Sequence, residues 1–245
     1  MITINQEIKS YFNAETEKKP FRNCIDNKEI FLLCKRSFDI IFSAVVIMFL
    51  LSWLVPIMAV AIKINSKGPV FFIQRRVGRG LRSFGCIKFR TMIPNKQSDK
   101  HIACENDYRV TTLGKFLRKT SLDELPQFIN VFIGDMSIVG PRPHMFADCN
   151  RFSEYIQDYK FRNVVRPGIT GLAQVKGFRG PAEDSYTIVS RFYYDSVYIQ
   201  NLSFRMDVSI VVHTLWQVLN LIFFNNVPKS EEAKKITSDP SKIAA

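Results

Sequence analysis

Two adjacent acidic residues, Asp123 and Glu124, are the strongest candidates for chemistry in this sequence. They precede Pro126, and proline is tolerated in the first turn of a helix, so a helix is predicted to begin near Asp123. At a helix N-terminus the peptide dipoles favour the ionised form of a carboxylate. An ionised carboxylate can act as a nucleophile or bind a divalent cation through oxygen.

The same pair also has a purely structural explanation. Ser121 and Glu124 match the Ser-x-x-Glu capping box, and Asp123 is itself a favoured capping residue. The box would place Pro126 at the fifth helical position, where its missing N–H matters, so this explanation is strained. The residues alone leave catalysis and capping both open.

Basic residues that could bind phosphate occur on both sides of this pair. Arg142 lies between two prolines in GPRP, and a fixed backbone reduces the entropy lost when a guanidinium binds phosphate. A structural ion pair explains Arg142 equally well. Val70–Ile73 and Phe84–Phe89 are predicted to be the strands of a hairpin, because glycines mark turns between them. Its basic residues are Arg75, Arg76, Arg79, Arg82, Lys88 and Arg90.

Lys88 and Arg90 flank Phe89, which is expected to be buried, and they are the predicted phosphate-binding pair of the hairpin. The alternatives are a solvated basic face or a ribbon that contacts lipid headgroups. A net charge of +12 and a pI of about 9.6 favour anionic partners of some kind, namely nucleic acid, acidic lipids or phosphorylated substrates.

Other metal-binding residue types form no recognisable site in the sequence. The three histidines are far apart, and the five cysteines include no Cys-x-x-Cys pair. We therefore expect reduced thiols in a cytosol-facing protein and any metal bound through oxygen.

A long uncharged run precedes the hairpin. From Ile40 to Ile62 no side chain is charged, and a helix of this length extends roughly 34 Å, enough to cross a hydrocarbon core of roughly 30 Å. Pro56 has no N–H to donate to the carbonyl of Ser52, so Ser52 and Pro56 mark an expected bend. Basic residues flank both ends of the run, which gives no preference for opposite sides of a membrane. A helix that bends and returns and a single span with a tolerated proline are both compatible with this pattern.

The rest of the chain divides by composition. Residues 163–180 are rich in glycine and proline and are predicted to form a structured loop, and residues 190–204 and 207–224 to form two helices. The second helix has a polar face (His213, Gln217 and Asn220), which favours an interfacial or docked amphipathic helix over a second span. The expected division is a polar extension at 1–34, a membrane helix at 35–66, a catalytic domain at 67–227 and a charged flexible tail at 228–245.

Taken together, several motifs resemble the bacterial sugar transferases, the monotopic phosphoglycosyl transferases that start lipid-linked glycan assembly. The resemblance runs from about Lys35 to Trp216. Its motifs are KRSFDIIFSAV, GPVFFIQRRVGR, KFRTM, TSLDELPQFINVFIGDMSIVGPRP and VRPGITGLAQV.

The resemblance implies a two-step reaction with Mg²⁺ as cofactor. Asp123 would attack the sugar-linked phosphorus of a UDP-sugar and expel UMP, and undecaprenyl phosphate would then attack the phosphosugar ester with the help of Glu124. Both acids would serve the metal, Arg142 and Arg166 would bind phosphate oxygens, and Asp195 matches the motif FYYDSVYI of members that transfer glucose-1-phosphate or galactose-1-phosphate. N-acetylated or amino-deoxy sugars are the alternative donors.

The implied fold is helix-rich α/β, a compact monotopic enzyme with a re-entrant membrane helix, a small β-hairpin or sheet and interfacial amphipathic helices. The resemblance places the enzyme at the bacterial inner membrane with its catalytic domain facing the cytoplasm, and it resembles the catalytic unit of longer relatives that carry a multi-span region. Anionic membrane lipids and a second copy of the chain are further expected partners. This sequence departs from the family at the bend, where Ser52 is followed by Trp53 instead of proline, and at Leu172 and Lys176, where Trp and Asn are usual.

Two other classes of protein are compatible with the bulk composition. A membrane-anchored nucleic-acid-binding protein would have basic residues interleaved with exposed aromatic residues, and no such platform is visible. A non-catalytic scaffold would keep its function when Asp123 or Glu124 is neutralised.

Overall fold

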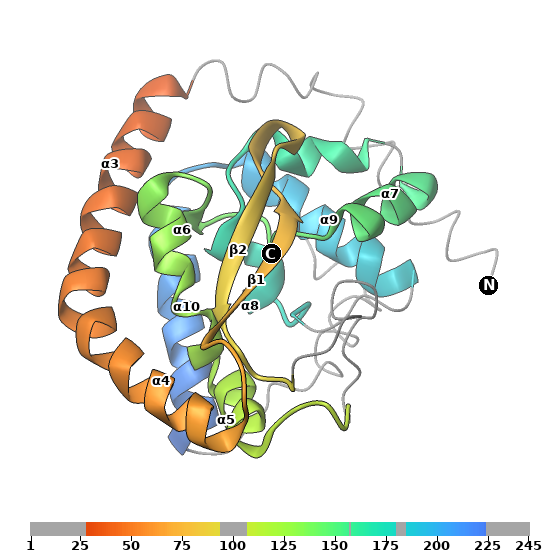
Figure 1. The fold of residues 1–245 in the computed structure, drawn as a ribbon. Helices are drawn as coiled ribbons and strands as arrows, with labels where there is room; N and C mark the ends of the chain where they lie inside the picture. Colours follow the sequence, from red (N-terminus) through yellow and green to blue (C-terminus); the bar gives the residue numbers. More distant parts are fainter. Residues whose placement is uncertain (1–27, 94–106, 157, 180–184, 224–245) are drawn as a thin grey trace.

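A long bent helix runs along one side of the molecule (Figure 1). The computed structural model describes residues 28–93, 107–156, 158–179 and 185–223. The predicted tail at 228–245 and most of the predicted extension at 1–34 lie outside the described residues.

The long helix consists of three successive segments, α3 (Glu29–Val46), the π-helical segment η1 (Ile47–Leu51) and α4 (Ser52–Asn65). It changes direction across η1 (Figure 1). The first residue of α4 is Ser52, whose hydroxyl donates to the carbonyl of Met48 over 2.6 Å, and Pro56 lies inside α4. The bend therefore follows from a wider helical turn, a side chain that bonds back to the main chain and a proline that lacks a donor.

Two helices of the described part are long and apolar enough to cross a membrane, Glu29–Asn65 and α10 (Phe204–Phe223). Only 11% of the most apolar window of each is buried inside the molecule, so their apolar side chains face outwards. An apolar surface of this size requires a nonaqueous neighbour or a partner protein.

Polar side chains fasten α3 to the rest of the molecule. Lys35 forms an ion pair of 2.6 Å with Asp207 of α10, and Asp39 accepts a 3.0 Å bond from the amide of Ile138. Arg36 donates to the carbonyls of Val131 and Phe132. Helix α3 begins at Glu29, upstream of the predicted boundary at 35, because this first part also packs against the core.

The predicted hairpin is present and is longer than expected. Strands β1 (Phe71–Val77) and β2 (Ser83–Phe89) pair antiparallel, and the short helical turn η2 (Arg79–Leu81) connects them. The side chain of Asn130 accepts a bond from the amide of Ile87 and donates to the carbonyl of Gly85, which joins the hairpin to helix α6 (Gln127–Ile133).

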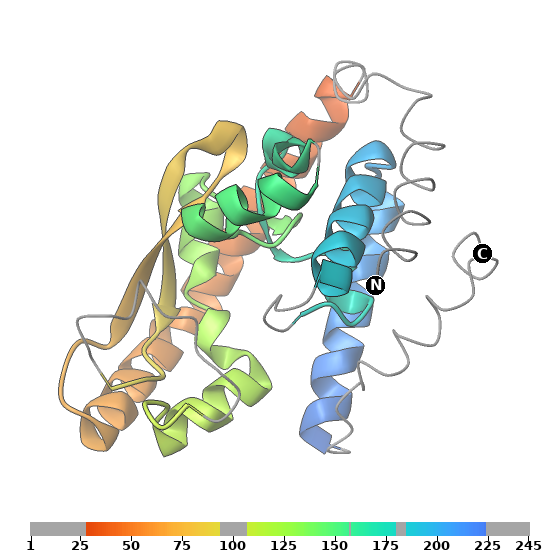
Figure 2. The same ribbon diagram turned by 90° about the vertical axis from the view of Figure 1, so that its right-hand side faces the viewer.

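The core lies between the hairpin and the two C-terminal helices. Strands β3 (Ser137–Val139) and β4 (Gly168–Thr170) pair in parallel in its centre. Figure 2 shows the hairpin and the helices α9 (Ser185–Gln200) and α10 on opposite sides of the molecule. The remaining elements are α5 (Thr112–Thr120), η3 (Leu122–Glu124), α7 (Phe146–Tyr155), η4 (Tyr159–Val164) and α8 (Leu172–Val175).

This is the expected helix-rich α/β architecture with small sheets. The two predicted C-terminal helices are confirmed as α9 and α10. Of the predicted polar face of α10, Gln217 packs inwards and donates to the carbonyl of Val175, whereas His213 is exposed. Thr214, which was not part of that prediction, bonds to Thr170 over 2.6 Å. The predicted loop at 163–180 contains β4 and α8, because the glycines of this segment allow a close approach to the GPRP segment: a Cβ at Gly168 would lie 2.1 Å from the amide nitrogen of Gly140.

Candidate active site

The two adjacent carboxylates lie in a single helical turn between two helices. Helix α5 ends where Ser121 adopts a left-handed conformation with φ of 60°, and Asp123 and Glu124 form the turn η3. Helix α6 begins only at Gln127, after Pro126. Both acids therefore precede α6 instead of starting it, which corrects the predicted helix boundary.

The capping box is absent. The hydroxyl of Ser121 accepts a bond from Arg179 over 2.8 Å, and the amide of Glu124 donates to the main-chain carbonyl of Ser121. The left-handed backbone of Ser121 explains this difference, because a capping residue has an extended backbone that turns its hydroxyl towards the helix. The capping explanation of the acidic pair is thus wrong.

Glu124 is neutralised by two cations that the sequence singled out. Its Oε1 lies 2.6 Å from Nζ of Lys88 and 2.7 Å from a terminal nitrogen of Arg142, and its Oε2 accepts from Arg142 over 3.2 Å. Burial by itself would raise the pKa of Glu124, but the charges and hydrogen bonds of Arg142 and Lys88 hold it well below its usual value. Arg142 and Lys88 therefore favour the ionised form of Glu124.

Asp123 is in the opposite situation. It is 8% exposed, and burial together with the negative charge of Glu124 raises the pKa of Asp123 to about 6. The positive charges of Lys88, Arg118 and Arg142 oppose this shift. Two neighbouring carboxylates with separated pKa values can take separate roles, and here Asp123 is the more basic of the two and the better placed to form a bond.

A main-chain scaffold presents Arg142. The amide of Gly168 donates to the carbonyl of Pro141, and Arg162 donates to the carbonyl of Arg142 over 2.8 Å. Arg162 is in turn held by a buried ion pair of 2.6 Å with Asp195. The orientation of Arg142 therefore depends on groups that never touch the acidic pair.

The sequence analysis did not identify Arg118 or Arg179 as neighbours of the acidic pair, and it did not single out Arg76 among the basic residues of the hairpin. Arg118, in the last turn of α5, donates to the hydroxyl of Thr91 and acts electrostatically on Asp123. Arg179 acts on both acids, and the charge of Arg76 lies close enough to Glu124 and Arg142 to interact with both. The signal for Arg118 was its place five positions before Asp123, whereas nothing local indicates Arg179.

Arg90 lies away from the pair and closes the end of helix α4. It is 6% exposed, and its guanidinium donates to the carbonyl of Ile62 in the last turn of α4 over 3.5 Å and to the carbonyl of Ser66, the residue that follows α4, over 2.6 Å. Unpaired carbonyls at a helix C-terminus are stabilised by such donors. Of the predicted hairpin pair, the structure brings only Lys88 to the acids.

Asp195 and Arg166 also lie elsewhere. Asp195 is 1% exposed and faces Arg162 in the interior. Arg166 donates to the carbonyl of Gly134, and the charges that act on it are those of Arg36, Arg79 and Asp39. The structure thus brings together Asp123, Glu124, Lys88 and Arg142 from three segments of the chain.

The carboxylates of Asp123 and Glu124 are compatible with an Mg²⁺ site that is completed by the phosphates of a substrate. Within the described ranges no group of three or more His, Cys, Asp and Glu residues could hold a metal. Mg²⁺ is commonly bound through one or two carboxylates together with substrate phosphates and water. Asp123 and Glu124 fit that pattern, with the cations around Glu124 leaving Asp123 as the better ligand.

Comparison with known proteins identifies the family. Residues 30–221 match the family described as bacterial sugar transferase. A UDP-glucose:undecaprenyl-phosphate glucose-1-phosphate transferase of Klebsiella pneumoniae is 44% identical over 187 residues, which cover 76% of this chain and 40% of the relative. A UDP-N-acetylgalactosamine-undecaprenyl-phosphate N-acetylgalactosaminephosphotransferase of Aeromonas hydrophila is 44% identical over 78% of this chain and 44% of its own length.

A shorter relative matches over almost its whole length. The exopolysaccharide production protein PSS of Rhizobium leguminosarum bv. phaseoli is 39% identical over 75% of this chain and 94% of its own length. By contrast, the chain spans about 40% of the length of the Klebsiella relative. The extent of the family match and the identity to these relatives establish that this chain belongs to the bacterial sugar transferase family.

Proposed function

We propose that this protein transfers a sugar-1-phosphate from a UDP-sugar to undecaprenyl phosphate and so initiates the assembly of an exopolysaccharide, capsule or O-antigen type glycan. The observation that carries the proposal is the asymmetry of the acidic pair. Glu124 is held as an anion by Lys88 and Arg142, while Asp123 has a pKa near 6 and no such ion pair with any described residue. Family membership and the names of the relatives support the substrate classes.

In the first step a carboxylate oxygen of Asp123 attacks the sugar-linked phosphorus of the donor. The new bond is an acyl phosphate, and the bond to the oxygen of UMP breaks, so UMP leaves with that electron pair. Lys88 and Arg142 bind the phosphate oxygens and stabilise the charge that builds up on them. Glu124 fixes both cations before the substrate arrives, so little reorganisation is needed.

In the second step an oxygen of undecaprenyl phosphate attacks the same phosphorus. The bond to Asp123 breaks, the carboxylate is regenerated, and the product is undecaprenyl-diphosphate-sugar. Asp123 and Glu124 would hold Mg²⁺, which would neutralise charge on the substrate phosphates. No net proton is gained or lost by Asp123 over the cycle.

The membrane arrangement is part of the same proposal. A re-entrant helix with both ends on the cytoplasmic side of the inner membrane agrees with the bend at η1 and with basic residues at both ends. The inward polar contacts of α10 through Thr214 and Gln217 support an interfacial helix, with its apolar face on the lipid. The acidic pair then lies on the side where UDP-sugars are made.

The function is tested by UMP release from purified protein in detergent or lipid, with Mg²⁺, undecaprenyl phosphate and a panel of UDP-sugars. The panel contains glucose, galactose, N-acetylgalactosamine and an amino-deoxy sugar. We expect UMP and a lipid-linked sugar with one donor, glucose or galactose, and dependence on both undecaprenyl phosphate and Mg²⁺. Release of UMP with an N-acetylated donor instead would support the same reaction with a different donor. If folded protein releases no UMP with any donor of the panel, the proposal is rejected.

The first half-reaction is expected to depend on pH through Asp123. Burial raises its pKa to about 6, so the carboxylate is ionised and reactive above this pH and protonated below it. The rate of UMP formation without undecaprenyl phosphate should therefore be level above about pH 7 and fall about tenfold per unit below about pH 6. A single-turnover experiment without the acceptor measures this step alone, and thermal unfolding at each pH checks that the protein stays folded. A rate that is level down to about pH 5 would contradict the assignment.

A further inference from the structure

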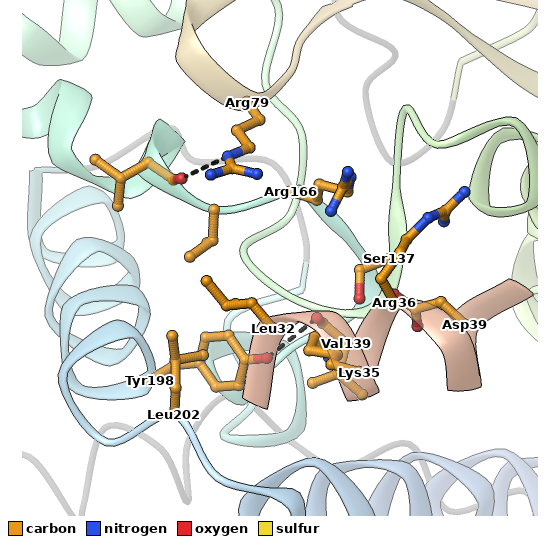
Figure 3. Close-up of a pocket in the computed structure, with 12 residues that line it drawn as sticks. Leu32, Lys35, Arg36, Asp39, Arg79, Ser137, Val139, Arg166, Tyr198 and Leu202 are labelled. Carbon is orange, nitrogen blue, oxygen red and sulfur yellow. Dashed lines mark hydrogen bonds between the residues drawn. The ribbon is translucent and has the colours of Figure 1, made fainter. Parts of the chain in front are cut away.

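We propose that a second pocket, between α3, the tip of the hairpin and strand β3, binds a phosphate group. It is separate from the acidic pair, since neither Asp123 nor Glu124 lines it. Figure 3 shows Arg79, Arg166 and Arg36 following one another along one side, with Ser137 nearby. The inference concerns binding alone and does not depend on the proposed reaction.

Main-chain carbonyls hold these guanidinium groups in place. Arg79 donates from Nε to the carbonyl of Val164 over 3.2 Å, and Arg166 donates from Nε to the carbonyl of Gly134 over 3.0 Å. The terminal nitrogens of both residues have no hydrogen-bond partner in the part of the chain that the structure describes. Arginines fixed through Nε present a ready pair of donors to a tetrahedral oxyanion.

The pocket carries an excess of positive charge. Burial lowers the pKa of Arg166, and the neighbouring charges of Arg36 and Arg79 lower it further. Lys35 is already neutralised by Asp207. The lining carboxylate, Asp39, accepts from the amide of Ile138 and offsets only part of the charge of three arginines. A bound anion would relieve the repulsion that the fold maintains here.

An unpartnered hydroxyl supplies an independent indication of a ligand. Ser137 is 2% exposed, lines the pocket and has no hydrogen-bond partner for its Oγ among the described residues. Leaving a buried hydroxyl without a partner costs stability, so such groups usually have one that the protein alone does not reveal. A phosphate has several acceptor oxygens, so it offers a partner to the hydroxyl of Ser137 as well as to the arginines that line the pocket.

The surroundings suggest where the phosphate comes from. Arg36, which lines the pocket, also donates to the carbonyl of Phe132 near the end of α6. The side chains of Phe132 and Ile133 are exposed there. The adjacent surface of α3 exposes Leu33 and Phe38. The pocket thus borders an apolar surface, which suits the phosphate of a lipid headgroup, while free phosphate offers the same chemistry from solution.

The test compares two exposed arginines of the same hairpin tip. Arg79→Gln removes a pocket donor, whereas Arg82→Gln removes the same charge from a position that does not line the pocket. The full chain in nonionic detergent is titrated with phosphatidylglycerol, phosphatidylcholine or inorganic phosphate at constant ionic strength, and affinity is taken from the rise in melting temperature. We expect Arg79→Gln to weaken binding about tenfold, Arg82→Gln to leave it unchanged and Ser137→Ala to weaken it severalfold.

Each outcome decides the proposal or its ligand. If Arg79→Gln weakens binding of phosphatidylglycerol and Arg82→Gln does not, the ligand is a lipid headgroup. If the same difference appears with inorganic phosphate, the ligand is a soluble phosphate. Equal weakening by Arg79→Gln and Arg82→Gln would mean diffuse attraction and would overturn the site. Wild-type affinity in both Arg79→Gln and Ser137→Ala, or no binding of any probe, would overturn it as well.

Discussion

Replacing Asp123 with asparagine is expected to reduce UMP release by at least about 10⁴-fold, because an amide cannot form the acyl phosphate on which both steps depend. The side chains have the same shape, and within the described part of the chain Asp123 forms no ion pair that the substitution would break. The fold should therefore survive, with a melting temperature close to that of the wild type.

The covalent intermediate offers a direct measurement. Intact mass of the wild type incubated with the donor, and without undecaprenyl phosphate, should increase by one phosphosugar, and Asp123→Asn should show no such increase. Asp158→Asn is the matched control, because Asp158 is exposed and its left-handed backbone accepts asparagine. An adduct on Asp123→Asn would mean that another group is the nucleophile.

Glu124→Gln tests the division of labour within the pair. The substitution leaves Lys88 and Arg142 without the anion that positions them. These two cations should then orient the donor phosphate less well, and the turnover rate should fall strongly. The pKa of Asp123 should also fall, because the neighbouring negative charge is gone. The acid limb of the single-turnover pH profile should move to lower pH in this variant.

Removing the carboxylate of Asp195 is expected to have the largest effect on the fold. Asp195→Ala leaves Arg162 as an unpaired charge in the interior, where both side chains are 2% exposed, and should cost about 3–5 kcal/mol of unfolding free energy. Arg162 also donates to the carbonyl of Arg142, so the loss of Asp195 should disturb the position of Arg142. The turnover rate per folded molecule should therefore be lower than that of the wild type.

A double-mutant cycle separates the ion pair from its burial. Asp195→Leu combined with Arg162→Met replaces the pair by apolar groups of similar size and should recover much of the lost stability. Thermal unfolding in detergent measures all four proteins. Additive losses would show that the two residues act independently, and recovered stability with poor turnover would assign the pair to the positioning of Arg142.

The sequence was informative where function depends on local pattern. Asp123, Glu124, Lys88 and Arg142 were predicted from motifs, and the structure brings these four together. Arg179 was not predictable, because it reaches the acids only through the packing of the segment after α8 against α5.

The capping prediction was wrong because the same motif is compatible with two backbone conformations. The capping box failed because Ser121 adopts a left-handed backbone that side-chain identity does not specify. Two arginines predicted to bind phosphate lie away from the acidic pair: Arg90 donates to main-chain carbonyls after α4, and Arg166 lines the pocket that we propose as a phosphate site. Nothing in their local sequence distinguishes these uses.

The attachment of α3 to the core has a consequence for how the acceptor is presented. Lys35, Arg36 and Asp39 join one helix to α10, α6 and β3, so this helix and the acidic pair should move as one rigid body. The height of Asp123 above the hydrocarbon would then be set by the fold, and not adjusted by a hinge. Under the proposed function, the acceptor must bring its phosphate to that height, so we expect the rate to depend on the first isoprene units and not on the total number of units in the acceptor.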